Sequence, residues 1–259
     1  MSSTAERLTL ERRTQTAIVT VNRPEARNAM TFEMYDALER CCEEVDADEE
    51  LRVMVVRGAG GTFAAGTDIA EFRDFSSGED GLAYERKLDG IVGRVEAVRK
   101  PTIAMVEGHC VGGGLAIAAA CDLRLCTPEA KFGMPIARTL GNCLSMKNYA
   151  RLVGLIGPGR TRELILTARS FSAEEARGAG LATEVVPAEE LEGRVLELAE
   201  RMAGFAPLTL SATKEALRRL RLAGLPDGHD LVAECYGSED FRAGVAAFNE
   251  RRPPVWSGR

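Results

Sequence analysis

GHCVGGGLAIAAACD, residues 108–122, is the stretch that decides the expected fold. An apolar run typical of a strand, residues 102–106, precedes it, and its own residues 115–120 have the composition of a helix. The three glycines therefore lie where a strand passes into a helix. The first amides of a helix have no intrahelical acceptor, and glycine lets another molecule come close to the backbone. This stretch predicts a backbone site for an anion or for an oxygen on which negative charge develops.

Two nucleotide-binding motifs do not match these glycines. A phosphate-binding Walker loop needs Lys and then Ser or Thr after its last glycine, whereas Gly114 is followed by Leu115 and Ala116. The Gly-x-Gly-x-x-Gly pattern of dinucleotide-binding folds is also missing. Close packing of a buried helix is the alternative explanation, because small residues permit that as well.

The composition is that of an ordinary globular protein. The 259 residues are 45% apolar and 28% charged, and the formal charge of −6 gives no electrostatic reason to expect a nucleic acid partner. The seven cysteines form no Cys-x-x-Cys pair, so we expect reduced packing residues and no metal site. No run reaches the roughly 18 to 20 apolar residues that would span a membrane. We therefore expect a cytoplasmic protein.

Hydrophobic periodicity predicts strands and helices along the chain. Strands are expected at 8–10, 17–22, 53–57, 102–106, 123–126, 131–133 and 183–186, and helices at 31–46, 84–98, 158–167 and 174–179. Small residues at 62–69 form a second loop that a ligand can approach closely. The polar segment 71–81 is expected to be mobile and to lie over another part of the molecule.

The character of the chain changes near residue 190. Three long, charged, amphipathic helices are expected at 189–205, 207–222 and 237–251, with no strand between them. We expect an α/β core at residues 1–190 and a helical region at residues 191–259 that packs on this core or on a neighbouring subunit.

Five segments in order resemble the enoyl-CoA hydratase/isomerase (crotonase) superfamily. They are NRPEARNAM (22–30), FAAGTDI (63–69), the stretch 108–122, FGMP (132–135) and FNERR (248–252). The resemblance implies a spiral core of ββα turns with a C-terminal helical trimerisation region. It also implies an enzyme that binds acyl-CoA thioesters as a homotrimer or a dimer of trimers. No separate cofactor is implied, because coenzyme A is part of the substrate.

The resemblance further implies roles for individual residues. Two backbone amides, those of Thr67 and Gly113, would stabilise the oxygen of a thioester enolate, which is worth a few kcal/mol for each donor in a dry site. The residues that would border the coenzyme are Ala26, Arg27, Ala65, Asp68, Ile69 and Arg251. A helix cap is the alternative for Asp68, and an ordinary surface charge is the alternative for Arg251.

The sequence departs from the family where proton transfer is expected. Hydratases have one glutamate two residues after the glycines and another directly after the Phe-Gly-x-Pro proline, and these positions are Ala116 and Ile136 here. Neither side chain exchanges a proton, so standard hydration is not predicted. The expected function is that of an acyl-CoA enzyme of this superfamily, a lyase or isomerase, that stabilises a thioester enolate. Other CoA-thioester chemistry, such as decarboxylation or hydrolysis, is an alternative. The second hypothesis is a catalytically silent acyl-CoA-binding trimer.

Three sets of residues are candidates for the missing acid or base. Glu71 is the first choice among four acids on or after the 62–69 loop, the others being Asp68, Asp74 and Glu85. His109 beside the glycines is a second candidate, with a packing histidine as the alternative. The third set is Arg138, Asn142, Cys143 and Ser145, in which Asn142 offers a hydrogen bond. The segment Gly141-Asn142-Cys143 resembles the Gly-Asn-Asp of the chlorobenzoyl-CoA dehalogenases, whose aspartate is the nucleophile. Cys143 would take the place of that aspartate, and a buried inert thiol is the alternative.

Overall fold

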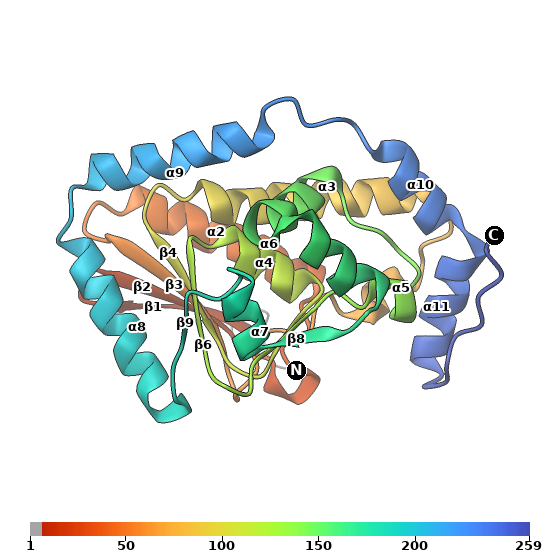
Figure 1. Cartoon of the computed structure of the whole chain (residues 1–259), viewed down its shortest axis with the longest axis horizontal. Helices are drawn as coiled ribbons and strands as arrows, with labels where there is room; N and C mark the ends of the chain where they lie inside the picture. Colours follow the sequence, from red (N-terminus) through yellow and green to blue (C-terminus); the bar gives the residue numbers. More distant parts are fainter. Residues whose placement is uncertain (1–6) are drawn as a thin grey trace.

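A six-stranded sheet forms the centre of the computed structural model, which describes residues 7–259 (Figure 1). Its strand order is β1-β2-β3-β4-β6-β9. β1 and β2 form an antiparallel hairpin, and each later neighbour is parallel. The strands are β1 (Leu8–Arg13), β2 (Thr16–Val21), β3 (Val53–Gly58), β4 (Thr102–Val106), β6 (Leu123–Cys126) and β9 (Glu184–Val185). The predicted strands are thus confirmed, with small differences at their ends.

A second, three-stranded sheet has the order β5-β7-β8. It consists of β5 (His109–Val111), β7 (Lys131–Gly133) and β8 (Ser170–Ser172). The chain passes from β4 in the first sheet to β5 in the second and then directly into helix α4 (Gly113–Ala120). The glycine-rich stretch therefore joins the two sheets and begins a helix, which places its backbone at a junction of layers.

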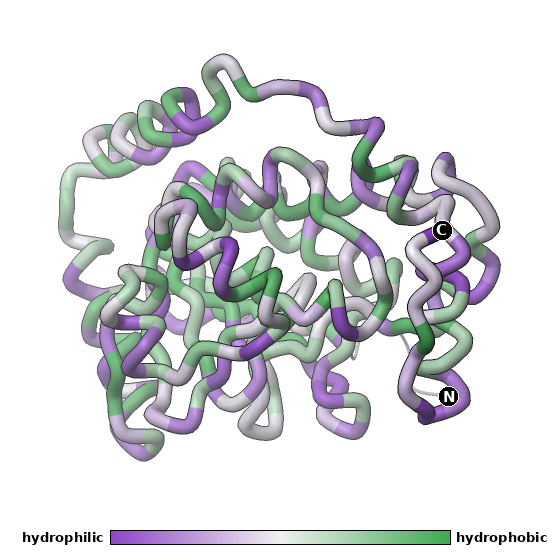
Figure 2. The backbone as a smooth tube through the Cα atoms, turned by 45° about the vertical axis from the view of Figure 1, so that its right-hand side comes forward, coloured by the Kyte–Doolittle hydropathy of each residue, from purple (hydrophilic) through white to green (hydrophobic). Residues whose placement is uncertain are grey.

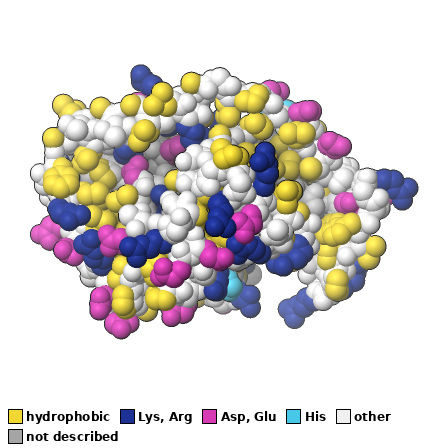
Figure 3. All heavy atoms as spheres, in the orientation of Figure 1, with side chains coloured by type: hydrophobic (Ala, Val, Ile, Leu, Met, Phe, Trp, Pro, Cys, Tyr) yellow, Lys and Arg dark blue, Asp and Glu magenta, His cyan; other side chains and the backbone are white. Residues whose placement is uncertain are grey.

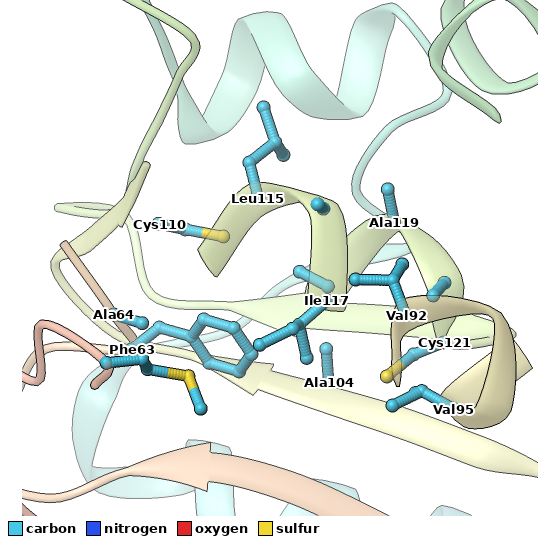
Figure 4. Packing of buried hydrophobic residues seen from close by; sticks show 14 of the residues in the cluster. Phe63, Ala64, Val92, Val95, Ala104, Cys110, Leu115, Ile117, Ala119 and Cys121 are labelled. Atoms are coloured by element: carbon cyan, nitrogen blue, oxygen red, sulfur yellow. The ribbon is translucent and has the colours of Figure 1, made fainter. Parts of the chain in front are cut away.

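Alternate residues of the central strands enter two separate apolar cores, as expected when both faces of a sheet are covered. On one face lie Val56, Ala104 and the helices α2 (Phe32–Ala47), α3 (Gly78–Ala97), α4 and α6 (Met146–Leu166). On the other face, Val55 and Ile103 pack against α8 (Ala188–Ala203). α4 is buried on two sides, because Ile117 points toward Phe63 and Ala104 while Leu115 points the opposite way (Figure 4).

The C-terminal helices run around the core rather than forming a separate bundle. α9 (Pro207–Leu222) crosses from the end of α8 toward α10 (His229–Gly237), which packs along α3 (Figures 1 and 2). α11 (Glu239–Asn249) contacts η2 (Ile69–Phe72) and α5 (Ile136–Thr139). The remaining short elements are η1 (Pro24–Ala26) and α7 (Ala173–Gly178). The proposed division at residue 190 is not tested by these contacts and stays a prediction.

Two helices begin earlier than the sequence predicts. α3 begins at Gly78 instead of Tyr84, because Ser77 and Asp80 form a reciprocal capping box at its start. α6 begins at Met146 with Ser145 as its cap, and a non-helical residue, Gly157, separates its two halves. The prediction of a helix from Pro158 found only the second half.

The segment 71–81 does lie over another part of the chain. Phe72 is buried, and its ring meets those of Phe75, Tyr84 and Phe241 in edge-on contacts 4.9 to 6.0 Å between centroids. The segment thereby links η2 to α3 and α11. Across residues 7–259, no helix is long and apolar enough to cross a bilayer. No cluster of three or more potential metal ligands occurs over the same range.

Candidate active site

A cavity of about 940 Å³ lies where the five motif segments meet helix α3. Its walls come from the turn 23–29, the loop 65–69, helix α3, the start of α4, and the segment 134–148, with residues 247–252 at one side. The first and the last of these segments are more than 200 residues apart in the sequence. The fold therefore gathers the motif segments around a single space large enough for a small-molecule ligand.

Two glycine turns approach each other closely at the wall of this cavity. Gly66 and Gly112 have φ values of +104° and +55°, which L-residues with a side chain rarely adopt. A Cβ on Gly66 would lie 3.3 Å from the Val111 carbonyl oxygen and 3.7 Å from the Gly113 nitrogen. A Cβ on Gly112 would lie 3.6 Å from the Gly66 Cα. Glycine at both positions permits the backbone conformation and the approach of the two turns.

Thr67 and Gly113 both line the cavity. Met30 donates its N–H to the Gly66 carbonyl and accepts the N–H of Asp68, which leaves the intervening Thr67 N–H directed away from Met30. Gly113 is the first residue of α4, so its N–H has no intrahelical partner. Neither amide has a protein acceptor within residues 7–259. Two free donors thus flank the closest approach of the two turns.

The carboxyl group of Glu85 is the one buried acid among the residues that line the cavity. The residue is 4% exposed. Its Oε1 accepts a hydrogen bond of 2.8 Å from the Tyr236 hydroxyl on α10, and its Oε2 accepts one of 3.0 Å from the Ser145 backbone N–H. Each carboxyl oxygen therefore has a fixed donor, and the group is held at the cavity wall in one orientation.

Burial changes the acidity of this carboxyl group. Removal from water, with a smaller contribution from the charge of the nearby Asp89, raises the pKa of Glu85 to about 8, although the Tyr236 and Ser145 donors offset part of the rise. At neutral pH the group is mostly protonated but close to titration. A carboxyl group with a pKa near the working pH can both deliver and accept a proton.

A polar network holds the surroundings of Glu85 in place. The Asn142 side chain donates from Nδ2 to the Tyr236 hydroxyl over 3.0 Å, so the tyrosine is held between an amide and the carboxyl group. The Ser145 hydroxyl donates to Asp89 Oδ1 over 2.5 Å. Ser145 thus contacts one acid through its backbone and a second acid through its side chain, one turn further along α3.

Three hydroxyl groups meet beside the two glycine turns. The Thr67 Oγ1 atom lies 2.9 Å from the Tyr35 hydroxyl and 2.7 Å from the Tyr84 hydroxyl. Tyr84 lines the cavity, whereas Tyr35 is 1% exposed and lies outside the lining. Burial is the main cause that raises the pKa of Tyr84 well above 10, so its hydroxyl stays protonated.

The sequence-predicted binding residues all line the cavity: Ala26, Arg27, Ala65, Asp68, Ile69, Asn142 and Arg251. Asp68 also accepts the Ala70 N–H at the start of η2, which is the helix-cap role considered as its alternative. Its second oxygen receives Arg23 Nη1 at 2.6 Å. Arg27 and Arg251 are exposed at the surface, where their charges face solvent.

The other candidates for an acid or base are placed differently. Glu71, the first choice from the sequence, does not line the cavity and lies partly exposed in η2. His109 lines the cavity with an exposed side chain. Cys143 is buried, lies outside the lining and donates its thiol to the Leu231 carbonyl at 3.4 Å.

Comparison with known proteins assigns the chain to a family. The family description that matches residues 11–259 is enoyl-CoA hydratase/isomerase. A probable enoyl-CoA hydratase of Mycobacterium tuberculosis is 33% identical over 260 residues, which cover 99% of this chain and 100% of the relative. The chain belongs to the enoyl-CoA hydratase/isomerase family.

Solved structures of this family agree with the fold. A methylmalonyl-CoA decarboxylase in complex with 2S-carboxypropyl-CoA matches with a TM-score of 0.90 and 29% identity over 100% of both chains. A methylmalonyl-CoA decarboxylase bound to 2-nitronate-propionyl-CoA matches with a TM-score of 0.89 and 28% identity, over 98% of this chain and 99% of the other. The predicted crotonase fold is confirmed.

In this member of the enoyl-CoA hydratase/isomerase family, Ala116 and Ile136 both line the cavity. They bring a methyl group and a branched alkyl group to the positions at which the motifs imply carboxyl groups. The sequence motifs do not single out the ionisable groups on α3, because Glu85 is one of four acids in the first candidate set and no motif includes Tyr84. A signal for them existed, because residues 84, 85, 88, 91, 92 and 95 follow the apolar spacing of α3 and are buried.

Proposed function

We propose that this chain is an acyl-CoA thioester enzyme that forms an enolate and uses Glu85 as its proton carrier. The observation that supports this role is a buried carboxyl group, fixed by two donors, in the same cavity as two free backbone amides. The amides of Thr67 and Gly113 would receive the negative charge that develops on the thioester oxygen. Arg27 and Arg251, at the exposed part of the cavity, would face the phosphates of coenzyme A.

A single proton carrier restricts the reaction that we expect. The cavity is lined by three acids, but Asp68 is paired with Arg23 and Glu25 is exposed, so Glu85 is the acid held near apolar walls. Addition of water to an enoyl thioester calls for one group to activate water and one to deliver the proton. Reactions in which the same group removes and returns a proton, or in which carbon dioxide leaves and a proton replaces it, need one such group. We therefore expect crotonyl-CoA to be hydrated slowly or not at all.

Exchange of hydrogen for deuterium tests enolate formation without knowledge of the net reaction. The enzyme is incubated in D₂O with butyryl-CoA, and deuterium at the carbon next to the thioester is followed by mass spectrometry. We expect exchange in the wild type, near-complete loss in Glu85→Gln, and no loss in the matched variant Glu71→Gln. Exchange that persists in Glu85→Gln and disappears in Glu71→Gln would restore Glu71 as the proton carrier.

A catalytically silent acyl-CoA-binding protein is the second candidate function. The apolar side chains of Ala116 and Ile136 in the cavity are the observation that favours it. Binding of several CoA thioesters, measured by calorimetry, with no exchange and no turnover on any of them would support this candidate over the enzyme. Methylmalonyl-CoA and crotonyl-CoA belong in that panel, because they separate decarboxylation from hydration.

We also propose that the chain assembles as a homotrimer or a dimer of trimers. The support for this assembly is the apolar surface of α9, where Leu208, Leu217 and Leu220 are 83%, 63% and 74% exposed. Apolar groups lie along the upper edge of the molecule in Figure 3, where Figure 1 places α9. Burial of such groups between subunits is favourable. Light scattering coupled to size-exclusion chromatography measures the assembly, and a monomer at micromolar concentration would overturn it.

A further inference from the structure

The hydroxyl groups of Tyr35, Thr67 and Tyr84 form a chain that has more hydroxyl hydrogens than hydrogen bonds between its members. Three O–H groups share two oxygen-to-oxygen contacts, of 2.9 Å and 2.7 Å, and each contact uses one hydrogen. One hydrogen is therefore left over, and it belongs to Tyr35, Thr67 or Tyr84 according to the directions of the two hydrogen bonds.

The start of α4 fixes this direction. A Cβ on Gly113 would lie 2.1 Å from the Tyr35 hydroxyl oxygen, so that oxygen packs directly against the first residue of the helix. The N-terminus of a helix carries partial positive charge and favours oxygen lone pairs over a hydrogen. The Tyr35 hydrogen is therefore directed to Thr67. A hydroxyl group that accepts one hydrogen bond becomes a stronger donor, so a continuous chain, in which the Thr67 hydrogen is directed to Tyr84, is favoured over Thr67 accepting from both tyrosines. Within residues 7–259, Thr67 is the one hydrogen-bond partner of Tyr84.

We propose that the Tyr84 hydroxyl is a third hydrogen-bond donor to the thioester oxygen, beside the two backbone amides. This inference rests on the proposed function and adds a catalytic side chain to it. Within one threonine, the nitrogen and Oγ1 are about 3 Å apart by covalent geometry, so the Tyr84 oxygen lies within about 6 Å of the Thr67 nitrogen. Two donors that each reach one oxygen over about 2.8 Å lie up to nearly 6 Å apart.

The step that this donor assists balances as follows. The C–H bond next to the thioester breaks, and its proton passes to the Glu85 carboxylate. The electron pair forms a carbon–carbon double bond, while the carbonyl oxygen takes the negative charge. The Tyr84 O–H donates to that oxygen without losing its proton, because burial keeps the pKa of this phenol well above 10. The hydrogen bond from this hydroxyl is strongest when the thioester oxygen is anionic. It therefore stabilises the transition state more than the bound substrate, which accelerates the reaction.

Binding of an enolate mimic tests this role without a turnover assay. The nitronate of 2-nitropropionyl-CoA presents a planar anion in place of the enolate, and S-propyl-CoA, which has no carbonyl oxygen, serves as the reference ligand. Loss of one donor to a charged oxygen weakens binding by about 10- to 100-fold. We expect Tyr84→Phe to lose this factor for the nitronate and to bind S-propyl-CoA as the wild type does. Tyr35→Phe keeps the terminal donor and should lose less than Tyr84→Phe.

The outcomes separate this inference from the proposed function. A wild type that binds the nitronate no more tightly than S-propyl-CoA would overturn the enolate site itself. Tight binding by the wild type and equally tight binding by Tyr84→Phe would overturn the third donor alone. A loss in Tyr35→Phe as large as that in Tyr84→Phe would overturn the assigned direction of the chain. Circular dichroism of both variants establishes that they are folded.

Discussion

Replacement of Glu85 by glutamine should change how stability depends on pH. In the folded protein the pKa of Glu85 is raised to about 8, whereas an unfolded glutamate ionises near the ordinary value of 4.5. Between these values the folded state keeps a proton that the unfolded state releases. The free energy of unfolding of the wild type therefore falls as the pH rises from about 4.5 to 8, and this contribution is constant above that range. Glu85→Gln has no proton to release and should lack this fall.

The size of the effect follows from the two pKa values. A rise from 4.5 to about 8 corresponds to a loss of the order of 5 kcal/mol at pH 8 and above, a large fraction of the stability of a typical domain. The difference between variant and wild type should thus increase with pH by up to this amount in favour of Glu85→Gln. The variant gains stability at alkaline pH and loses its proton carrier, a trade-off common at active sites.

Urea denaturation followed by circular dichroism at pH 5, 6, 7, 8 and 9 measures this difference. All other titrating groups are shared, so the comparison isolates the substituted carboxyl group. Glu79→Gln changes an exposed acid on the same helix and should follow the wild type at every pH. Parallel curves for Glu85→Gln and the wild type between pH 5 and 8 would refute the buried, protonated state of Glu85.

Three further measurements examine the site. Tyr236→Phe removes a donor that lowers the pKa of Glu85, so the midpoint of the pH dependence of deuterium exchange should move upward. Asp89→Asn removes a nearby charge that raises this pKa, so the midpoint should move downward. Shifts of both midpoints in the same direction would contradict this. Gly113→Ala places a methyl group 2.1 Å from a buried tyrosine hydroxyl. We therefore expect the variant to lose about 1 to 3 kcal/mol of stability in thermal melts and to lose nitronate binding. An unchanged melting curve would contradict the close contact. Six of the seven cysteines are buried and Cys235 is partly exposed, so peptide mapping should find Cys235 alkylated first by iodoacetamide at pH 7.5. Prior labelling of another cysteine would contradict this.

The parts of the fold that the sequence predicts are those in which local chemistry and burial agree. The strand 53–57 is apolar throughout because both faces of the sheet are covered, and Thr31 caps α2 as its hydroxyl group suggests. The nine-residue helix α10 escaped prediction. It follows a segment with Gly224, Pro226 and Gly228, which indicates a loop, and its helical state depends on packing along α3.

The candidate site is likewise predictable from the sequence only in part. Backbone features, such as the glycine turns at 66 and 112, follow from residue type and motif order, because the positive φ values at these two positions favour glycine. The acid is different, since Glu71 and Glu85 are both glutamates in a charged region and differ only in what surrounds them. The apolar spacing of α3 places residue 85 inside, but its partner Tyr236 lies 151 residues away on the helix that was not predicted.

The dependence of Glu85 on α10 gives the C-terminal helices a part in the site itself. Tyr236 on α10 holds one carboxyl oxygen, and a Cβ at Gly81 would lie 2.2 Å from the Tyr236 side chain, so the start of α3 and α10 are in direct contact. If these helices served assembly alone, a change in α10 would alter the association of subunits and leave the pKa of Glu85 unchanged. Because the hydroxyl group of Tyr236 contributes directly to that pKa, a displacement of α10 must alter the proton affinity of the cavity. Packing along α3 therefore connects the position of the C-terminal region with the protonation state of the residue that we propose moves the proton.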